Sequence, residues 1–183
     1  MSRKIEKYLL AIVPDESVCQ KITQLKEQLY ESFGLKYALK SPPHITLKMP
    51  FVHNEKKEGE LIKLLQGYIA KEKTFPLSLR GVGAFGNRVS FLKVRYPPEL
   101  MLFQQGLIRF FKRNLKKHLE LSDTNFHPHL TVAFKDFKKG QFDEVMECVK
   151  NAAIKESIQV HQVSLLKKVN GLWVKIADIN LKN

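Results

Sequence analysis

The chain has 183 residues, which is enough for one domain with a full core and too few for two ordinary domains. Hydrophobic residues make up 44% and charged residues 27%, a balance typical of soluble globular proteins. The longest apolar stretch near the start, residues 8–13, is too short for a signal-peptide core or a membrane span. We therefore expect a cytoplasmic protein with no membrane partner.

The chain is strongly basic, with 31 Lys and Arg against 18 Asp and Glu and a formal charge of +13. A surplus of this size attracts polyanions, although a basic surface that serves solubility explains it equally well. Cys19 and Cys148 match no metal-binding or redox spacing, so we expect reduced, unremarkable thiols.

The first elements along the chain are a strand and a helix. Residues 7–13 predict a strand, and residues 16–33 predict a helix for which Asp15 is the expected N-cap. Apolar residues recur at helical spacing along this segment and form its buried stripe: Val18, Ile22, Leu25 and Leu29.

A second strand contains His44. Pro42 and Pro43 stiffen its entry, and Pro50 is expected to end it. Helical spacing returns at residues 59–70.

The middle of the chain predicts two strands and a long helix. Residues 75–94 have the pattern of two strands joined by a turn at residues 86–87. Residues 98–119 predict an amphipathic helix whose inward residues are Leu102, Leu107, Ile108, Phe111 and Leu115.

The last part predicts the His129 strand, a helix over residues 142–150 and a hairpin. The hairpin has one strand at residues 157–169 and the other at residues 172–181. Asn170-Gly171 between them is a strong signal for a tight turn. The order of elements is roughly parallel in the two halves of the chain, and no linker divides them. We predict an α+β fold in which residues 1–183 form a single domain of two intertwined, pseudo-symmetric lobes, each with an antiparallel sheet and flanking helices.

Two similar segments carry the chemistry: Pro43-His44-Ile45-Thr46-Leu47 and Pro128-His129-Leu130-Thr131-Val132. Side chains alternate between the two faces of a strand, so the histidine and the threonine of each segment share a face while the aliphatic residues point into the core. If an approximate two-fold axis relates the lobes, one cavity receives two imidazoles and two hydroxyls.

This set of groups suits the hydrolysis of a phosphodiester. The reaction needs a base for water, an acid for the departing oxygen and donors for the non-bridging oxygens. A histidine with its ordinary pKa of about 6.5 can serve as either acid or base near neutrality, and threonine hydroxyls can bind phosphoryl oxygens. The arrangement requires no metal or other cofactor.

The two segments resemble the paired His-x-Thr-x motifs of the two-histidine (2H) phosphoesterases, and within them the 2′-5′ RNA ligase-like branch. The resemblance implies a bilobed fold with a central cleft and the hydrolysis of 2′,3′-cyclic phosphates to 2′-phosphates. It further implies that His44 is the general acid, that His129 is the general base, and that Thr46 and Thr131 bind the phosphate. The expected partner is RNA or a cyclic nucleotide, with no obligate protein partner.

The sequence departs from the family pattern after the second motif. Several RNA-acting relatives have an arginine where this chain has Phe134, with Lys135 beside it. This difference leaves open which residue balances the phosphate charge. The candidates for that role or for base stacking are Phe51, Phe126, His127 and Lys135.

Structural roles compete with these assignments. Core packing is the main alternative for Phe51, Phe85 and Phe126, and a solvated surface is the expectation for Lys48. His127 and His129 could chelate a metal, but no matching third ligand is evident, so no metal site is expected. A basic cluster on the predicted long helix is expected to be its solvated face: Lys112, Arg113, Lys116 and Lys117.

Three functions fit the sequence. The first is a metal-independent cyclic phosphodiesterase. The second is a module that binds a nucleotide or an RNA end without reaction. The third is a 2′-5′ RNA ligase that runs the reverse reaction.

Overall fold

The computed structural model describes residues 4–182. Eight strands form one sheet in the order β6-β3-β4-β5-β2-β1-β7-β8, and every neighbouring pair is antiparallel. The strands are β1 (Ile5–Ile12), β2 (Ile45–Asn54), β3 (Phe75–Phe85), β4 (Val89–Arg95), β5 (His129–Phe134), β6 (Lys155–Val160), β7 (Gln162–Val169) and β8 (Leu172–Asn180). The helices are α1 (Glu16–Phe33), α2 (Glu58–Ile69), α3 (Pro98–Arg113), α4 (Leu121–Thr124) and α5 (Phe142–Asn151), with 3-10 turns η1 (Tyr37–Lys40) and η2 (Glu55–Lys57).

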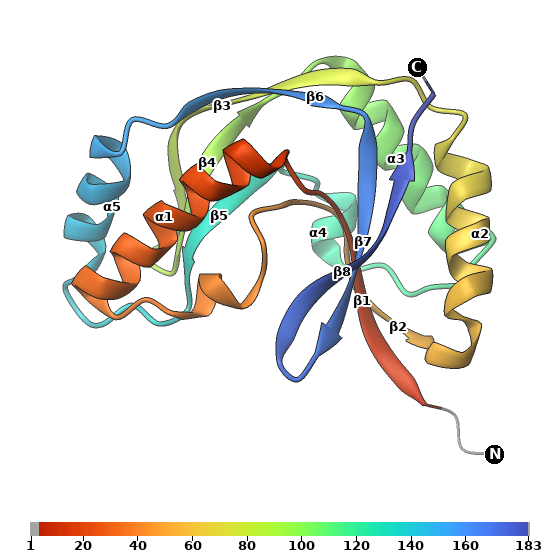
Figure 1. The fold of residues 1–183 in the computed structure, drawn as a ribbon, viewed down its shortest axis with the longest axis horizontal. Coiled ribbons are helices and arrows are strands. Elements are labelled where there is room, and N and C mark those ends of the chain that lie inside the picture. Colours follow the sequence, from red (N-terminus) through yellow and green to blue (C-terminus); the bar gives the residue numbers. More distant parts are fainter. Residues whose placement is uncertain (1–3, 183) are drawn as a thin grey trace.

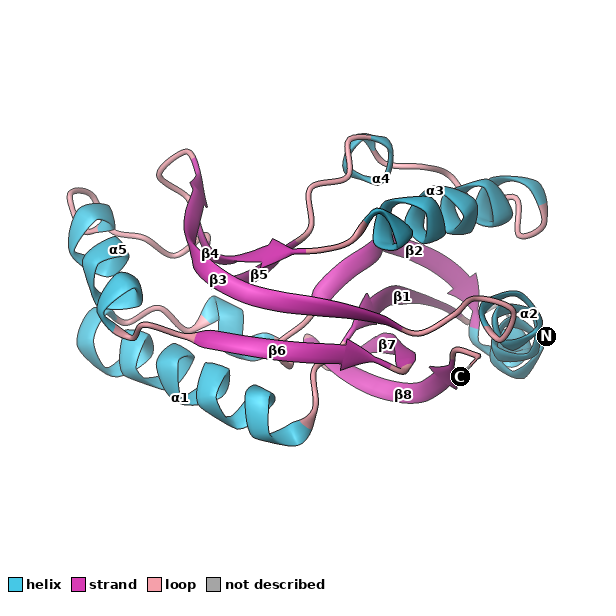
Figure 2. Cartoon of the chain, turned by 90° about the horizontal axis from the view of Figure 1, so that it is seen from above, coloured by secondary structure: helices cyan, strands magenta, loops and turns pink. Residues whose placement is uncertain are grey.

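The sheet consists of two half-sheets that meet at a single residue pair. We call β6, β3, β4 and β5 the β5 half-sheet, and β2, β1, β7 and β8 the β2 half-sheet; Ile45 pairs with Leu130 where they join. Helices α1 and α5 lie beside the β5 half-sheet, whereas α2 and α3 lie beside the β2 half-sheet (Figures 1 and 2). Since α1 follows β1 in the chain but packs against β5, the lobes are intertwined. The predicted α+β fold with two lobes is confirmed.

The apolar stripe of α1 is buried as predicted: Val18, Ile22, Leu25 and Leu29 are at most 3% exposed. Asp15 caps this helix, because its Oδ1 accepts a hydrogen bond from the Val18 N–H at 2.9 Å. Asn170 and Gly171 both have positive φ, at 49° and 85°, as a tight hairpin turn between β7 and β8 requires.

Pro50 does not end the second strand, contrary to expectation, because β2 continues to Asn54. The register between β1 and β2 shifts between the pairs Tyr8–Phe51 and Leu10–Lys48, which places Pro50 in a bulge. Because Pro50 lies in a bulge, the ladder does not need a hydrogen-bond donor at this position, and β2 can continue past it.

The predicted helix over residues 98–119 was too long, since α3 ends at Arg113. The chain then turns back, with Lys116 at φ 49° and the Lys117 Nζ donating to the Val52 carbonyl at 2.7 Å. Leu102 is 66% exposed, not inward, because it lies outside the stripe that α3 buries. That stripe consists of Leu100, Phe103, Gln104, Leu107, Ile108 and Phe111.

The predicted strand over residues 157–169 is two strands, β6 and β7, which separate at His161. The first pairs with β3 and the second with β1 and β8, so the chain crosses from one half-sheet to the other at this point. Within residues 4–182, no helix combines the length and the hydropathy that a membrane span needs.

Candidate active site

The junction of the half-sheets brings the two motifs together. Ile45 pairs with Leu130, and the same antiparallel register places His44 beside Thr131 and Thr46 beside His129. Residues that face each other across antiparallel strands share a side of the sheet, with Cβ atoms about 5 Å apart. Ile45 and Leu130 are both fully buried on the opposite side. All four predicted site residues therefore project from one face of the junction.

The two motif strands have matching irregularities. In β2 the register shifts after Thr46, and both Leu47 and Lys48 are buried; in β5 it shifts after Thr131, and both Val132 and Ala133 are buried. A bulge reverses the alternation of side chains that follows it. Lys48 is consequently 0% exposed, which corrects the expectation that it is solvated.

The two histidine rings are anchored by equivalent hydrogen bonds to the backbone. His44 Nδ1 lies 2.8 Å from the Pro42 carbonyl, and His129 Nδ1 lies 2.7 Å from the His127 carbonyl. Because a carbonyl oxygen only accepts, each Nδ1 must carry a hydrogen and donate it. Each Nε2 is then the nitrogen that can take up or release a proton toward a ligand.

Burial lowers the pKa of both histidines. The pKa of His44 falls to about 4, chiefly through desolvation and further through the positive charge of Lys26 and, when it is protonated, of His129, while the hydrogen bond to Pro42 opposes the shift. The pKa of His129 is also lowered by desolvation, against the opposing hydrogen bond to His127. Both rings are therefore neutral near pH 7 when no ligand is bound.

The threonines complete the set of polar groups. Thr46 and Thr131 are half-buried, and neither hydroxyl is hydrogen-bonded to another group within residues 4–182. A hydroxyl in this state can donate to a ligand oxygen without first breaking a bond to the protein.

A cavity of about 250 Å³ opens at the junction. Both half-sheets and the α4 region line it, through Thr46, Leu47, Met49, Phe85, Ser122, Asp123, Asn125, Phe126, His127 and His129. Two of the predicted flanking residues, Phe126 and His127, are thus in the wall, together with the motif residues His129 and Thr46. His44 and Thr131 are not among the residues that line it, so this cavity forms only part of the predicted cleft between the lobes.

Aromatic rings hold His129 in place. The ring of Phe85 meets that of His129 edge-on, with centroids 4.9 Å apart, and the centroid of Phe91 lies 5.1 Å from that of His129. Phe91 lies across Gly83, where an added Cβ would be only 2.4 Å from the ring. Sequence reasoning missed Phe91 and Gly83, because their role depends on the pairing of β3, β4 and β5.

A buried polar network fixes α4 against β2. Lys48 Nζ lies 2.7 Å from Asp123 Oδ2, and the two side chains are 0% and 1% exposed. Asp123 also accepts from the Met49 N–H, and Gln104 donates to the carbonyls of Leu47 and Asp123. The network stabilises the cavity wall that contains Asp123 and Phe126. Its members gave no functional signal in the sequence.

Two predicted flanking residues do not line this cavity. Phe51 is 6% exposed and packs between Tyr8 and Phe111 in the core, which is the structural alternative considered for it. Lys135 lies at the far end of β5, where its Nζ is 4.9 Å from the ring centroids of Tyr37 and Phe134. Neither residue is therefore placed to contact a phosphate between the histidines.

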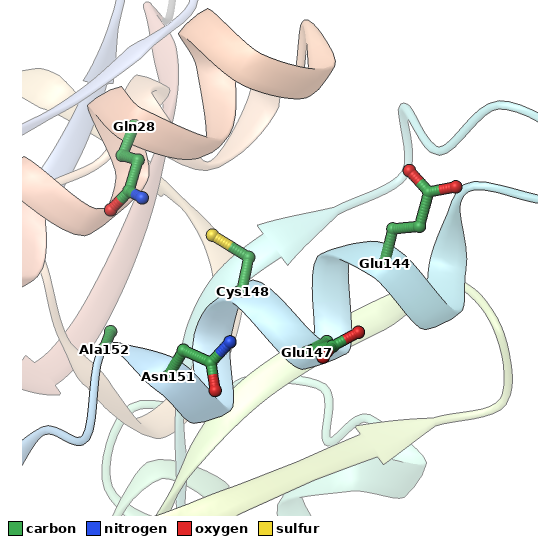
Figure 3. Close-up of a pocket in the computed structure, with 6 residues that line it drawn as sticks. All are labelled: Gln28, Glu144, Glu147, Cys148, Asn151 and Ala152. Atoms are coloured by element: carbon green, nitrogen blue, oxygen red, sulfur yellow. The ribbon is translucent and has the colours of Figure 1, made fainter.

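A second cavity, of about 450 Å³, lies between α1 and α5 (Figure 3). Gln28 and Cys148 point toward each other there, and Glu144 and Glu147 are among the residues that line it. Two carboxylates make it unsuited to an anionic phosphate. Neither in this cavity nor anywhere else in residues 4–182 is a group of three or more His, Cys, Asp and Glu arranged to hold a metal ion.

Comparisons with known proteins identify the family. The 2′-5′ RNA ligase superfamily matches residues 14–172. A Bacillus cytotoxicus protein named as a candidate phosphoesterase is 31% identical over 128 residues, covering 69% of this chain and 68% of that protein. A Bacillus mycoides protein with the same description is 26% identical over 167 residues, covering 90% of each chain.

Solved structures share the fold. E. coli LigT complexed with 3′-AMP has a TM-score of 0.68 at 19% identity, covering 98% of this chain and 100% of that one. A Thermus thermophilus protein has a TM-score of 0.65 at 18% identity, covering 97% of this chain and 98% of that one. The matched residues and the paired motifs lead to one conclusion: the chain belongs to the 2′-5′ RNA ligase superfamily of two-histidine phosphoesterases.

Proposed function

We propose that this protein is a metal-independent phosphodiesterase that hydrolyses 2′,3′-cyclic phosphates of RNA ends or nucleotides to 2′-phosphates. The observation that carries the proposal is the equivalent anchoring of the two imidazoles, each with its Nδ1 tied to a backbone carbonyl two residues earlier. Each Nε2 is thereby left for proton transfer, and two threonine hydroxyls accompany the rings on the same face.

The reaction balances with these groups alone. The unprotonated Nε2 of one ring takes a proton from water while the water oxygen bonds to phosphorus. The bond from phosphorus to O3′ breaks, and O3′ receives the proton that the other ring holds on its Nε2. The products are a 2′-phosphate and a 3′-hydroxyl. Solvent then returns the proton from the first ring to the second.

A bound phosphodiester carries a negative charge, which favours protonation of one of the two neutral rings. Thr46 and Thr131 donate hydrogen bonds to its non-bridging oxygens and stabilise the charge that develops there. Solved LigT structures include complexes with 3′-AMP and with phosphate, which supports a nucleotide phosphate as the ligand class.

The surroundings of the rings favour His129 as the acid and His44 as the base. The buried Lys26 ammonium, which donates to the carbonyls of Ala38 and Ser41 at 3.1 and 3.2 Å, opposes protonation of His44. This assignment reverses the one implied by the family resemblance. Both assignments use the same pair of residues, and they differ in the direction of proton flow.

The test is turnover of a 2′,3′-cyclic mononucleotide by the purified protein in EDTA. His44→Ala and His129→Ala should each lower turnover by about 10²–10⁴-fold. His118→Ala is the matched control, because His118 is exposed in the segment between α3 and α4. Persistence of activity in the double alanine variant would rule out the two histidines as the catalysts.

The same experiment separates the competing functions. Tight nucleotide binding without product after long incubation would favour a binding module. Joining of RNA halves that end in a 2′,3′-cyclic phosphate and a 5′-hydroxyl would favour ligation. Sequencing the joined product for a 2′-5′ linkage distinguishes this reaction from hydrolysis.

A further inference from the structure

A row of cationic residues begins at His129 and crosses the β5 half-sheet. Lys93 of β4 is paired directly with His129, and Arg80 of β3 is paired with Lys155 of β6. Between these two pairs, the register of β3 against β4 shifts near Gly81. A Cβ added at Gly81 would lie 3.8 Å from Lys93 Cδ. Lys93, Arg80 and Lys155 thus lie on three successive strands that lead away from the candidate active site.

This row lies on the face of the half-sheet that the helices do not cover. Lys93, Arg80 and Lys155 are exposed, whereas neighbours such as Leu92 and Leu79 are buried toward α1 and α5. Because paired residues share a face, the cations project from the same side as the His129 ring.

The face carries no balancing negative charge from its own strands. Glu156 is the one acidic residue in β3, β4, β5 and β6, and its carboxylate pairs with Lys21 of α1 at 2.7 Å, on the helix-covered side. Within residues 4–182, none of the three cations of the row is in an ion pair. Such a surface attracts an extended polyanion.

A fourth cation and several polar groups lie next to the row. Arg95 pairs with Ser78, and Ser78 pairs with Ser157. These three residues line an open cavity of about 600 Å³ together with Tyr96, whose side chain is 41% exposed. A cation, two hydroxyls and an aromatic ring are the groups that bind phosphates and stack against bases.

The β2 half-sheet differs on the corresponding face. Ala11 pairs with Thr46, and Leu9 pairs with Leu166, so these apolar residues share the side of the site. Trp173 packs against them. Next to the motif strands the surface is therefore apolar on the β2 half-sheet and cationic on the β5 half-sheet. The cations Lys168 and Lys175 on this face of the β2 half-sheet lie farther from the site, where they pair with Trp173 and Leu166.

We propose that the row of Lys93, Arg80 and Lys155, with Arg95 beside it, binds the sugar-phosphate backbone of a single-stranded RNA whose terminal phosphate lies between the histidines. This inference rests on the proposed function and specifies its substrate as an oligoribonucleotide. Neighbouring strands are about 4.8 Å apart, so the row extends roughly 15 Å from His129. That length accommodates a few nucleotides beyond the reacting phosphate.

The test compares two substrates: a 2′,3′-cyclic mononucleotide and a hexaribonucleotide that ends in a 2′,3′-cyclic phosphate. The measured quantity is the ratio of kcat/KM for the hexamer to kcat/KM for the mononucleotide. In the double variant Arg80→Gln/Lys155→Gln this ratio should fall by roughly 10- to 100-fold at low salt, because two counterion-releasing contacts are lost. The control variant Lys63→Gln/Lys112→Gln removes two exposed cations from α2 and α3 and should leave the ratio unchanged.

The salt dependence provides a second measurement. The slope of log kcat/KM against log salt for the hexamer should become shallower by about 0.7 for each contact removed. Lys93→Gln should weaken both substrates, since Lys93 is next to the reacting phosphate. An unchanged ratio in Arg80→Gln/Lys155→Gln, or an equal fall for both substrates, would overturn the proposal.

A binding experiment distinguishes failure of the proposed catalytic function from failure of the proposed RNA-binding row. If neither substrate is turned over, binding of a fluorescent hexaribonucleotide with a terminal 2′-phosphate still reports on the row. Weaker binding in Arg80→Gln/Lys155→Gln than in the control would support the surface without the reaction. Equal binding by both variants would overturn the inference.

Discussion

Ile45 of β2 and Leu130 of β5 face each other where the two half-sheets meet. Each directly follows a motif histidine, so this one pair sets the relative position of both rings. Slipping the pairing by one residue would turn each motif side chain to the opposite face of the sheet. Both residues are fully buried, which ties the geometry of the site to the packing of the core.

Gly83→Ala should impair the site without unfolding the protein. The new Cβ would lie 2.4 Å from Phe91 Cε2, so the ring must move, and it supports His129 at a centroid distance of 5.1 Å. We expect kcat for a cyclic nucleotide to fall about tenfold or more, as the misplacement of a catalytic group typically causes. Gly67→Ala in α2 is the control, because no atom lies within 4 Å of its added Cβ. Unchanged kcat in Gly83→Ala would show that Phe91 does not position His129.

The protein should lose stability in mild acid because of His44. Its pKa of about 4 in the folded state lies below the ordinary value of about 6.5, so the unfolded chain binds more protons between these limits. The free energy of unfolding should therefore fall as pH decreases from 6.5 to 4, by up to about 3 kcal/mol from this residue. Urea unfolding at pH 7 and at pH 4.5 measures the loss.

His44→Gln isolates that contribution, since glutamine does not titrate. The variant should be less sensitive to acid than the parent protein, and His118→Gln should behave like the parent. Equal acid sensitivity in His44→Gln and the parent protein would contradict the assignment to His44.

Breaking the buried pair of Lys48 and Asp123 should be costly. Asp123→Ala leaves an ammonium group that is 0% exposed without its carboxylate, which typically costs about 3–5 kcal/mol. Lys48→Met/Asp123→Ala should recover part of this loss, because the unpaired charge is gone. Chemical denaturation of the single and double variants gives the coupling free energy.

The exposed ion pair of Lys21 and Glu156 is a matched comparison for the double-mutant cycle of Lys48 and Asp123. Its two charged atoms are also 2.7 Å apart, but the side chains are 58% and 18% exposed. Removing this pair should change the free energy of unfolding by about 0–1 kcal/mol. A similarly small change for Asp123→Ala would mean that the buried network does not stabilise the cavity wall.

A substrate with an activated leaving group should reveal the direction of proton flow. A p-nitrophenolate departs without needing a proton, so loss of the general acid matters little for a p-nitrophenyl phosphodiester. We expect His129→Ala to stay within about tenfold of the parent protein on this substrate, and His44→Ala to lose about 10²–10⁴-fold. The opposite pattern would support the assignment implied by the family resemblance.

The features that could be read from the sequence are those set by neighbours along the chain. The alternation in Pro43–Leu47 and Pro128–Val132 predicted that histidine and threonine share a face, and the spacing in α1 predicted its buried stripe. The turn at Asn170-Gly171 also followed from local backbone preferences. These patterns depend on strand and helix periods, which a linear sequence records directly.

Tertiary structure decided the features that depend on contacts between distant segments. The burial of Lys48 results from a bulge together with a partner, Asp123, that lies far along the chain. The support of His129 by Phe91 and the cation row of Lys93, Arg80 and Lys155 exist only once four strands pair in one register. Strand order and register are set by long-range packing free energy, so no local period in the sequence reveals which side chains become neighbours.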